Sequence, residues 1–155
     1  SCNLKMANNI QTLKDRIKVL EVAKSKLSRD WFEVEREKTK LLSAIENLPI
    51  GFLILDDYNK ITLKNKAARD ILDQGNSGDW TIDTLQNRLV KVYDLKKDIT
   101  NCLRERIHIG PVEIPFDKKT IRIFISPIII LKKGLTVPGS ILLIEDVTKD
   151  SAMVG

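Results

Sequence analysis

An apolar residue recurs at nearly every third or fourth position through the first 48 residues, and this rhythm constrains the fold more than any other feature. The steps alternate between four and three without a break, which is the a/d pattern of a heptad repeat. Because the apolar stripe is narrow and the other faces are mostly polar, a helix with this pattern needs a partner helix. The predicted seam follows Met6 and consists of Ile10, Leu13, Ile17, Leu20, Lys24, Leu27, Trp31, Val34, Lys38, Leu41, Ile45 and Leu48.

The residues of the seam favour a parallel homodimer. Branched Ile10, Ile17 and Ile45 at a positions, with leucine at most d positions, are typical of a two-stranded parallel coiled coil. Lys24 and Lys38 also occupy a positions, where lysine lowers stability but selects the register and the dimeric state. Two interpretations remain open, a static spacer and a marginal coil that shifts between two packings as a signal relay does.

Composition and charge exclude several functional classes. Hydrophobic residues make up 43% of the chain and charged residues 30%, proportions that exclude disorder and a membrane protein. The net charge of +5 is spread thinly, with ten basic against seven acidic residues in 1–48 and sixteen against fourteen in 49–155. Neither part has the concentrated basic stripe of a nucleic-acid-binding protein, so we expect no nucleic-acid partner.

Two further features concern the setting of the protein. Two cysteines, Cys2 and Cys102, are too few for a disulfide framework and favour a reducing cytoplasm. The longest apolar stretch, 123–131, is too short to span a bilayer, so we expect no direct membrane contact by this chain. The start at Ser1 and the short segment 149–155 indicate a piece of a longer protein, whose parent could be anchored in a membrane.

After Pro49 the hydrophobic period changes from about 3.5 to 2, which indicates a folded α+β domain following the helix. The spacing predicts the order β-β-α-α-α-β-β-β, with Asn65 placed to cap the first short helix. The predicted strands are 50–55, 60–63, 112–116, 120–131 and 140–147, the predicted helices are 65–72, 82–89 and 94–107, and the predicted loops include Gln74–Asp79 and 132–138.

Three segments of this block, in this order, resemble the PAS family. Leu48–Asp56 is similar to the first strand of the family, and Ile61–Ala68 is similar to its second strand and first helix. Pro138–Thr148 resembles the last strand with its closing Asp-x-Thr junction. The resemblance covers about residues 45–148 and implies a PAS-like five-stranded antiparallel sheet of order 2-1-5-4-3, with helices on one face. It also implies a sensory or dimerisation module rather than an enzyme.

A helix, a PAS-like domain and an Asp-x-Thr junction together are most similar to the arrangement in bacterial two-component sensor histidine kinases. The resemblance implies a dimerising coiled-coil helix over 1–48, a PAS domain over 49–148 and the start of an outgoing signalling helix over 149–155. The module would then pass a conformational signal to a C-terminal output domain of the parent chain. The alternative is a ligand-free assembly domain of a transcription regulator or of a cyclic-dinucleotide signalling protein.

Members of the family bind haem, flavin or small acids through particular residues, and this chain departs from those patterns. Its single histidine, His108, lies at a helix-to-strand joint, and Cys102 matches only the first half of the word around the light-sensing cysteine of the family. We therefore expect no cofactor, and the open alternatives are an apolar small molecule and a packed core. The residues predicted to face a ligand cavity are Phe52, Ile54, Leu72, Leu85, Ile99, Leu103, Phe124 and Leu142.

Catalytic and metal-binding patterns are missing from the sequence. It contains no phosphate-binding glycine loop and no nucleophile elbow, and one histidine cannot build a catalytic triad. Asp56 and Asp57 with Asn59 are better explained as a hairpin turn than as metal ligands. Arg122, inside a strand, is better placed on the solvent face than as an anchor for an acid. We expect no catalytic residue and no metal site in this chain.

Asp146 and Thr148 form the predicted signal junction, because they flank the point where the last strand gives way to the outgoing helix. Both side chains can accept hydrogen bonds from the free amide groups at a helix start. A bonded link of this kind would couple movement of the sheet to rotation of the helix. The simpler alternative is a helix cap without a signalling role.

Overall fold

The computed structural model describes residues 2–72 and 80–149. The chain folds as two compact units, Ser1–Ser43 and Ala44–Gly155. The predicted loop Gln74–Asp79, and all of the predicted outgoing helix except Lys149, lie outside the described residues.

Helix α1 spans Cys2–Glu46 and is continuous, as expected for a segment without glycine or proline. Within the described part of the chain, no helix combines the length and the apolar character needed to cross a membrane. No residue of α1 is buried, and the exposed fraction of Ile17 is 53% and that of Leu27 is 69%. Leu48, predicted as the last seam residue, lies beyond the end of the helix, because the chain turns after Glu46 and the Leu48 amide donates to the Ile45 carbonyl at 3.2 Å.

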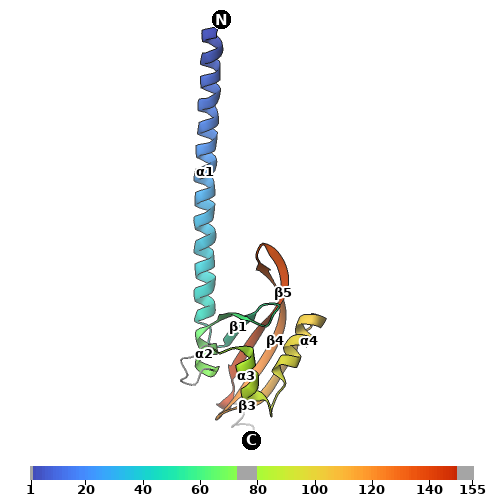
Figure 1. Cartoon of the computed structure of the whole chain (residues 1–155). Helices are drawn as coiled ribbons and strands as arrows, with labels where there is room; N and C mark the ends of the chain where they lie inside the picture. The colour runs from blue at the N-terminus through green and yellow to red at the C-terminus, as the bar shows by residue number, and fades with distance from the viewer. Residues whose placement is uncertain (1, 73–79, 150–155) are drawn as a thin grey trace. The chain divides into compact units, whose positions relative to one another are not determined.

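The second unit is built on a five-stranded antiparallel sheet of order β2-β1-β5-β4-β3. Figure 1 labels β1, β3, β4 and β5 of this sheet. This order is the one that the resemblance to PAS domains implies, so the predicted PAS-like α+β fold is confirmed. The central strands are apolar on both faces, as expected for strands with neighbours on each side. The strands are β1 (Gly51–Leu55), β2 (Ile61–Lys64), β3 (Ile109–Phe116), β4 (Lys119–Lys132) and β5 (Leu135–Asp146).

Three helices cover one face of this sheet (Figure 1): α2 (Lys66–Leu72), α3 (Ile82–Leu89) and α4 (Leu95–Glu105). Thr81 begins α3 with a capping box, in which Thr81 and Thr84 bond each other's backbone amides. Asp94 caps α4 at its start, and Arg106 caps its end in the left-handed conformation at φ 57°. The last helical residue, Glu105, is two residues short of the predicted end.

A single apolar core fills the space between the helices and the sheet. Each fully buried aliphatic side chain of this kind contributes about 1.5–3 kcal/mol to folding. The largest fully buried side chains in this unit are Leu53, Leu55, Leu72, Leu89, Leu95, Ile99, Ile121, Ile123, Ile125, Leu142, Ile144 and Val147.

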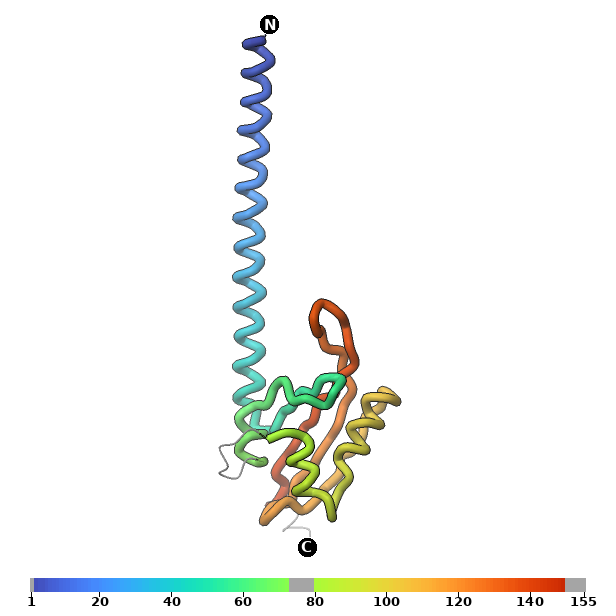
Figure 2. The backbone as a smooth tube through the Cα atoms, viewed as in Figure 1, coloured from blue at the N-terminus to red at the C-terminus, as the bar shows by residue number. Residues whose placement is uncertain are grey.

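The prediction of a loose loop over 132–138 is wrong. Strands β4 and β5 stay paired out to Lys132 and Leu135, and Lys133 with Gly134 makes the turn between them. Both turn residues have positive φ, 51° and 77°, as in the two-residue turns whose twist matches that of a hairpin. The paired strands extend past the ends of β1 and β3, and Figure 2 shows the hairpin projecting from the sheet.

Candidate functional site

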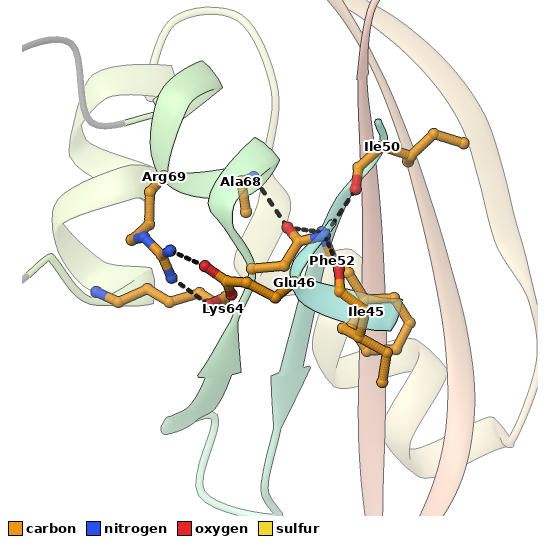
Figure 3. Close-up of polar contacts among 8 residues, drawn as sticks. Ile45, Glu46, Ile50, Phe52, Lys64, Ala68 and Arg69 are labelled. Atoms are coloured by element: carbon orange, nitrogen blue, oxygen red, sulfur yellow. Dashed lines mark hydrogen bonds and ion pairs between the residues drawn. The ribbon is translucent and has the colours of Figure 1, made fainter. Parts of the chain in front are cut away.

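The entry of the chain into the domain is fixed by one buried asparagine. Asn65 is 0% exposed, and its amide makes four hydrogen bonds. The Nδ2 group donates to the carbonyls of Ile45 at 2.8 Å and Ile50 at 2.9 Å. The Oδ1 atom accepts from the backbone amides of Phe52 at 2.8 Å and Ala68 at 3.0 Å. The partners belong to four segments: the last turn of α1, the linker of residues 47–50, β1 and α2; Ile45, Ile50, Phe52 and Ala68 are labelled in Figure 3, where dashed lines mark these bonds.

Local sequence explains only part of this position. Asn65 follows β2 directly and precedes α2, so its bond to the Ala68 amide is the capping interaction that the sequence predicts. The two bonds that the amide group donates, to carbonyls 20 and 15 residues earlier, were not predicted. One feature of the sequence could have revealed them. An asparagine at the end of a buried strand must find acceptors for both of its side-chain N–H groups, and a helix cap uses only its oxygen.

A second contact at the same place involves Arg69, one turn into α2. Its guanidinium forms an ion pair with the Glu46 carboxylate, and its Nη1 donates to the Lys64 carbonyl at 2.7 Å (Figure 3). The side chains of Arg69 and Glu46 are 40% and 44% exposed, so solvent screens this pair. We call the contacts of Asn65 and Arg69 with the last turn of α1, the linker and β1 the entry junction.

The exit from the domain has a different construction. The Asp146 carboxylate accepts from the hydroxyl of Thr148 and from its backbone amide, the latter at 3.0 Å. The Thr148 hydroxyl oxygen also accepts from the Thr120 amide at 3.1 Å, and the buried Val147 donates its amide to the Thr120 carbonyl at 2.9 Å. The hydrogen bonds from Thr148 hold the pKa of Asp146 below its usual range. We call this group the exit junction.

The two junctions lie next to each other because β1 and β5 are neighbours at the centre of the sheet. Gly51, the first residue of β1, is opposite Ile144, near the end of β5. A Cβ atom at Gly51 would lie 3.0 Å from both the Ala68 Cα and the Ile144 carbonyl oxygen, so any other residue would require the backbone here to shift by a few tenths of an ångström. A surface hollow of about 450 Å³ lies between the segment before β1, helix α2 and the end of β5. It is lined by Pro49, Ile50, Ala67, Asp70, Ile71, Glu145 and Asp146.

The predicted cavity residues fall into two groups, and part of the prediction is wrong. Leu72, Leu85, Ile99 and Leu142 are buried in the core between helices and sheet. In contrast, Phe52, Ile54 and Phe124 lie on the opposite face of the sheet from the helices, and Leu103 is only half-buried.

The contact between Gly51 and Ala68 explains the error in β1. It turns Gly51, Leu53 and Leu55 toward the helices, so the residues between them point away.

The outer face of the sheet carries an apolar row that the sequence analysis did not predict. Phe52, Leu143 and Phe124 stand opposite one another on three adjacent strands, and Ile54 pairs with Ile141 in the next row. All five side chains are half-buried in the single chain. The row shows that β1 and β5 present apolar side chains on both faces, which is why alternation alone did not reveal their orientation.

His108 and Arg122 also lie on or beside this outer face. His108 is exposed at the joint between α4 and β3, its ring stacks on Phe124 with centroids 5.8 Å apart, and its Nδ1 lies 3.0 Å from the Ser126 hydroxyl. Arg122 forms ion pairs with Glu113 at 2.8 Å and with Glu145 at 3.3 Å, so it lies on the outer face and does not point into the core.

The turn after β1 is fastened to the projecting hairpin. Oδ1 of Asp56, which is buried, accepts from the backbone amides of Tyr58 and Lys60, both at 2.9 Å. Lys132 lies 3.0 Å from the Asp57 carboxylate and 3.4 Å from that of Asp56. Burial opposes ionisation of Asp56, but the bonds from Lys60, Tyr58 and Lys132 hold its pKa below the usual value. These carboxylates therefore stabilise the turn and bind it to Lys132 of the hairpin.

The remaining candidate groups have no site around them in the described part of the chain. Cys102 is 0% exposed, and burial raises the pKa of its thiol, so it stays protonated in the core. Residues 2–72 and 80–149 contain no cluster of three or more His, Cys, Asp or Glu side chains that could hold a metal ion.

Comparison with known proteins gives similar structures and no similar sequences. No protein-family model matches the chain, and no curated protein matches it. The PAS domain of a Colwellia psychrerythraea protein is 11% identical, with a TM-score of 0.49, over 75% of this chain and 98% of that one. The PAS domain of nitrogen regulation protein NR(II) from Vibrio parahaemolyticus is 18% identical, with a TM-score of 0.47, over 68% and 95%. A sensory box sensor histidine kinase from Vibrio cholerae is 18% identical, with a TM-score of 0.43, over 77% and 98%.

Proposed function

We propose that this chain is a signal-relay module of a dimeric two-component sensor histidine kinase, in which a PAS-like domain links an incoming and an outgoing helix. Two copies pair through the seam of α1, and the domain passes a change of conformation to a C-terminal output domain. The observation that carries the proposal is the position of the entry and exit junctions on neighbouring strands, with Gly51 opposite Ile144.

The exposure of the seam supports pairing of α1. The side chains of Ile10, Leu13, Ile17 and Leu20 are 51–67% exposed in the single chain. A partner helix in register would remove these apolar surfaces from water, which stabilises the pair by about 25 cal/mol for each Å² buried. The lysines at positions 24 and 38 weaken the pairing locally, which suits a coil that changes its packing.

The route from entry to exit is short. A displacement of the last turn of α1 acts on the Asn65 amide through the Ile45 carbonyl, and the same amide holds Phe52 in β1. Strand β1 is bonded along its whole length to β5, which ends at Asp146. Because packed elements change between discrete arrangements and do not deform continuously, this path can transmit a shift without passing through the helical layer.

The core is part of the same proposal. Leu72, Leu85, Ile99 and Leu142 give it an aliphatic lining, so any ligand would be a small apolar molecule, and no residue there is suited to hold haem or flavin. We infer that the module works without a resident cofactor and catalyses no reaction itself. The two unpaired thiols, Cys2 and Cys102, are consistent with a cytoplasmic position in the parent protein.

The test is native mass spectrometry and light scattering of the purified chain at a concentration on the order of tens of micromolar. We expect a dimer of bare polypeptide mass that becomes a monomer in the double variant Leu20→Lys, Leu27→Lys. The control is Thr12→Lys, Ser25→Lys, which adds the same charge at exposed positions outside the seam and should stay dimeric. A monomeric wild-type chain, or a dimer that tolerates the seam variant, would overturn the pairing.

A further inference from the structure

A second row of side chains runs along α1 on the side opposite the seam. In a heptad, the c and f positions recur at three-four spacing and face away from a and d. From Val19 to Lys40 this row spans about 32 Å at 1.5 Å per residue. Its members are Val19, Val22, Lys26, Arg29, Glu33, Arg36 and Lys40, with Lys18 and Phe32 beside them at b positions. We call these nine residues the outer row.

Charge is sorted between the faces of this helix. The outer row carries five basic residues and one acidic residue, Glu33. The other acidic residues in the same stretch occupy the e and g positions that flank the seam: Glu21, Asp30, Glu35 and Glu37. Over residues 2–72 and 80–149, the outer row makes one ion pair, between Lys40 and Glu37 at 3.3 Å. The remaining positive charge is therefore presented outward, away from the helix's own carboxylates.

Apolar side chains stand within this basic row. Val19, Val22 and Phe32 are 67%, 67% and 66% exposed, as exposed as the seam itself. Pairing of two helices through a and d would leave all three in water, because b, c and f positions lie outside the seam. The Phe32 ring contacts that of Trp31 in the seam, with centroids 5.3 Å apart, but 66% of its surface stays exposed. A partner that covers the outer row would bury this surface together with Val19 and Val22.

We propose that the outer row is a docking surface for an acidic amphipathic helix of another protein. Apolar residues at three-four spacing in that helix would cover Val22 and Phe32, and carboxylates on both sides would pair with Lys26, Arg29 and Arg36. The inference rests on the proposed function in one respect: the coiled-coil dimer determines which side of α1 faces away from the partner helix.

The chemistry of the row favours a protein helix over the two other anionic surfaces. Nucleic acid requires concentrated positive charge along the phosphates, whereas the carboxylate of Glu33 and the apolar side chains of Val19, Val22 and Phe32 interrupt the basic residues of this row. A membrane surface requires a broad apolar face, and three exposed apolar side chains over about 32 Å are too few for stable insertion. A helix with one apolar row and acidic flanks matches both the spacing and the charge.

The experiment measures fluorescence anisotropy of a labelled synthetic helix of about three heptads, with leucine along one row and glutamate on both sides, titrated with the whole chain. We expect binding that weakens at least about tenfold in Lys26→Glu, Arg29→Glu, Arg36→Glu, and that weakens as salt rises from about 50 mM to about 500 mM. The pair Val22→Ser, Phe32→Ser should weaken it about fivefold or more, since it removes the apolar contacts.

A matched control separates this surface from overall charge. Lys66→Glu, Lys91→Glu, Lys118→Glu changes the net charge equally but lies on exposed positions of the folded domain, so it should bind like the wild type. Light scattering on every variant reports its oligomeric state. Weaker binding by a variant that is still dimeric is due to the outer row, whereas weaker binding by a monomeric variant is due to loss of the dimer.

The proposal is overturned if the helix does not bind or if the triple reversal on α1 binds like its control. It is equally overturned if vesicles of phosphatidylcholine with about one third phosphatidylglycerol, or a DNA duplex of about 20 base pairs, bind more tightly than the helix.

Discussion

The entry and exit junctions lie side by side on the sheet, but they are held in opposite ways. At the entry, one amide with no solvent exposure bonds four separate segments of the chain. At the exit, the carboxylate of Asp146 is exposed and, within residues 2–72 and 80–149, its hydrogen bonds come from Thr148, two residues away. Among the described residues, the polar side-chain contact that ties the exit to another strand is the bond from the Thr120 amide to the Thr148 hydroxyl.

This difference bears on how a relay can work. A buried polar group that loses its partners costs its full desolvation penalty, so the entry has one well-defined geometry. Exposed hydrogen bonds exchange readily with water, so the exit can rearrange at small cost. In the proposed relay, the entry junction would be a rigid input that follows movement of the incoming chain, and the exit junction would be a compliant output.

The largest expected effect is at the entry. Asn65→Ala takes away the Asn65 partner of the buried Ala68 amide, of the half-buried Phe52 amide and of the Ile50 carbonyl, while the Ile45 carbonyl keeps its bond from the Leu48 amide. We expect the substitution to lower the free energy of unfolding of the domain by about 3–5 kcal/mol. The measurement is urea unfolding followed by fluorescence of Trp80, which packs against the core, in a Trp31→Phe background.

The matched control for this variant is Asn101→Ala, whose side chain accepts an exposed hydrogen bond from Arg104 at 3.2 Å. It should change the free energy of unfolding by no more than about 0.5 kcal/mol. Equal effects of the two alanine substitutions would contradict the picture of a buried lock at the entry.

Particular residues explain how far the sequence could predict these features. The order of elements and the cap at Asn65 follow from local patterns, since strand alternation, turn residues and a capping side chain are encoded by neighbours. The orientation of β1 does not, because Phe52 and Leu53 are both apolar and the choice between the faces depends on the distant contact of Gly51 with Ala68. The bond from Asn65 to the Ile45 carbonyl likewise depends on where the chain leaves α1.

A smaller effect is expected at the exit. Asp146→Asn removes the charge that strengthens the bonds to Thr148, and at neutral pH we expect a loss of about 0.5–1 kcal/mol, since the group is exposed. Because the folded-state pKa of Asp146 is lowered, its contribution is present above the unfolded value of about 3.9 and is lost as pH falls through the folded value.

The difference in unfolding free energy between wild type and Asp146→Asn should therefore shrink as the solution is acidified. Urea unfolding over a series of pH values measures it, with Asp70→Asn, at an exposed position on α2, as the comparison variant that should match the wild type throughout. A difference that stays constant down to the most acidic folded sample would mean that the carboxylate charge is not what holds the exit.

The smallest effect on stability is expected from the exposed half of the entry junction. Arg69→Gln removes the ion pair with Glu46, and because both side chains are 40% or more exposed we expect a loss of only about 0.5 kcal/mol. Amide hydrogen exchange at Phe52 and Ala68, the two amides that Asn65 binds, gives the sharper reading. If Asn65 alone fixes the entry, exchange at both should stay within about threefold of the wild type. Acceleration of about tenfold or more would mean that the screened ion pair is needed to hold the buried Asn65 amide in place. The entry would then depend on an exposed contact, as the exit does, and the contrast between a rigid entry and a compliant exit would be wrong.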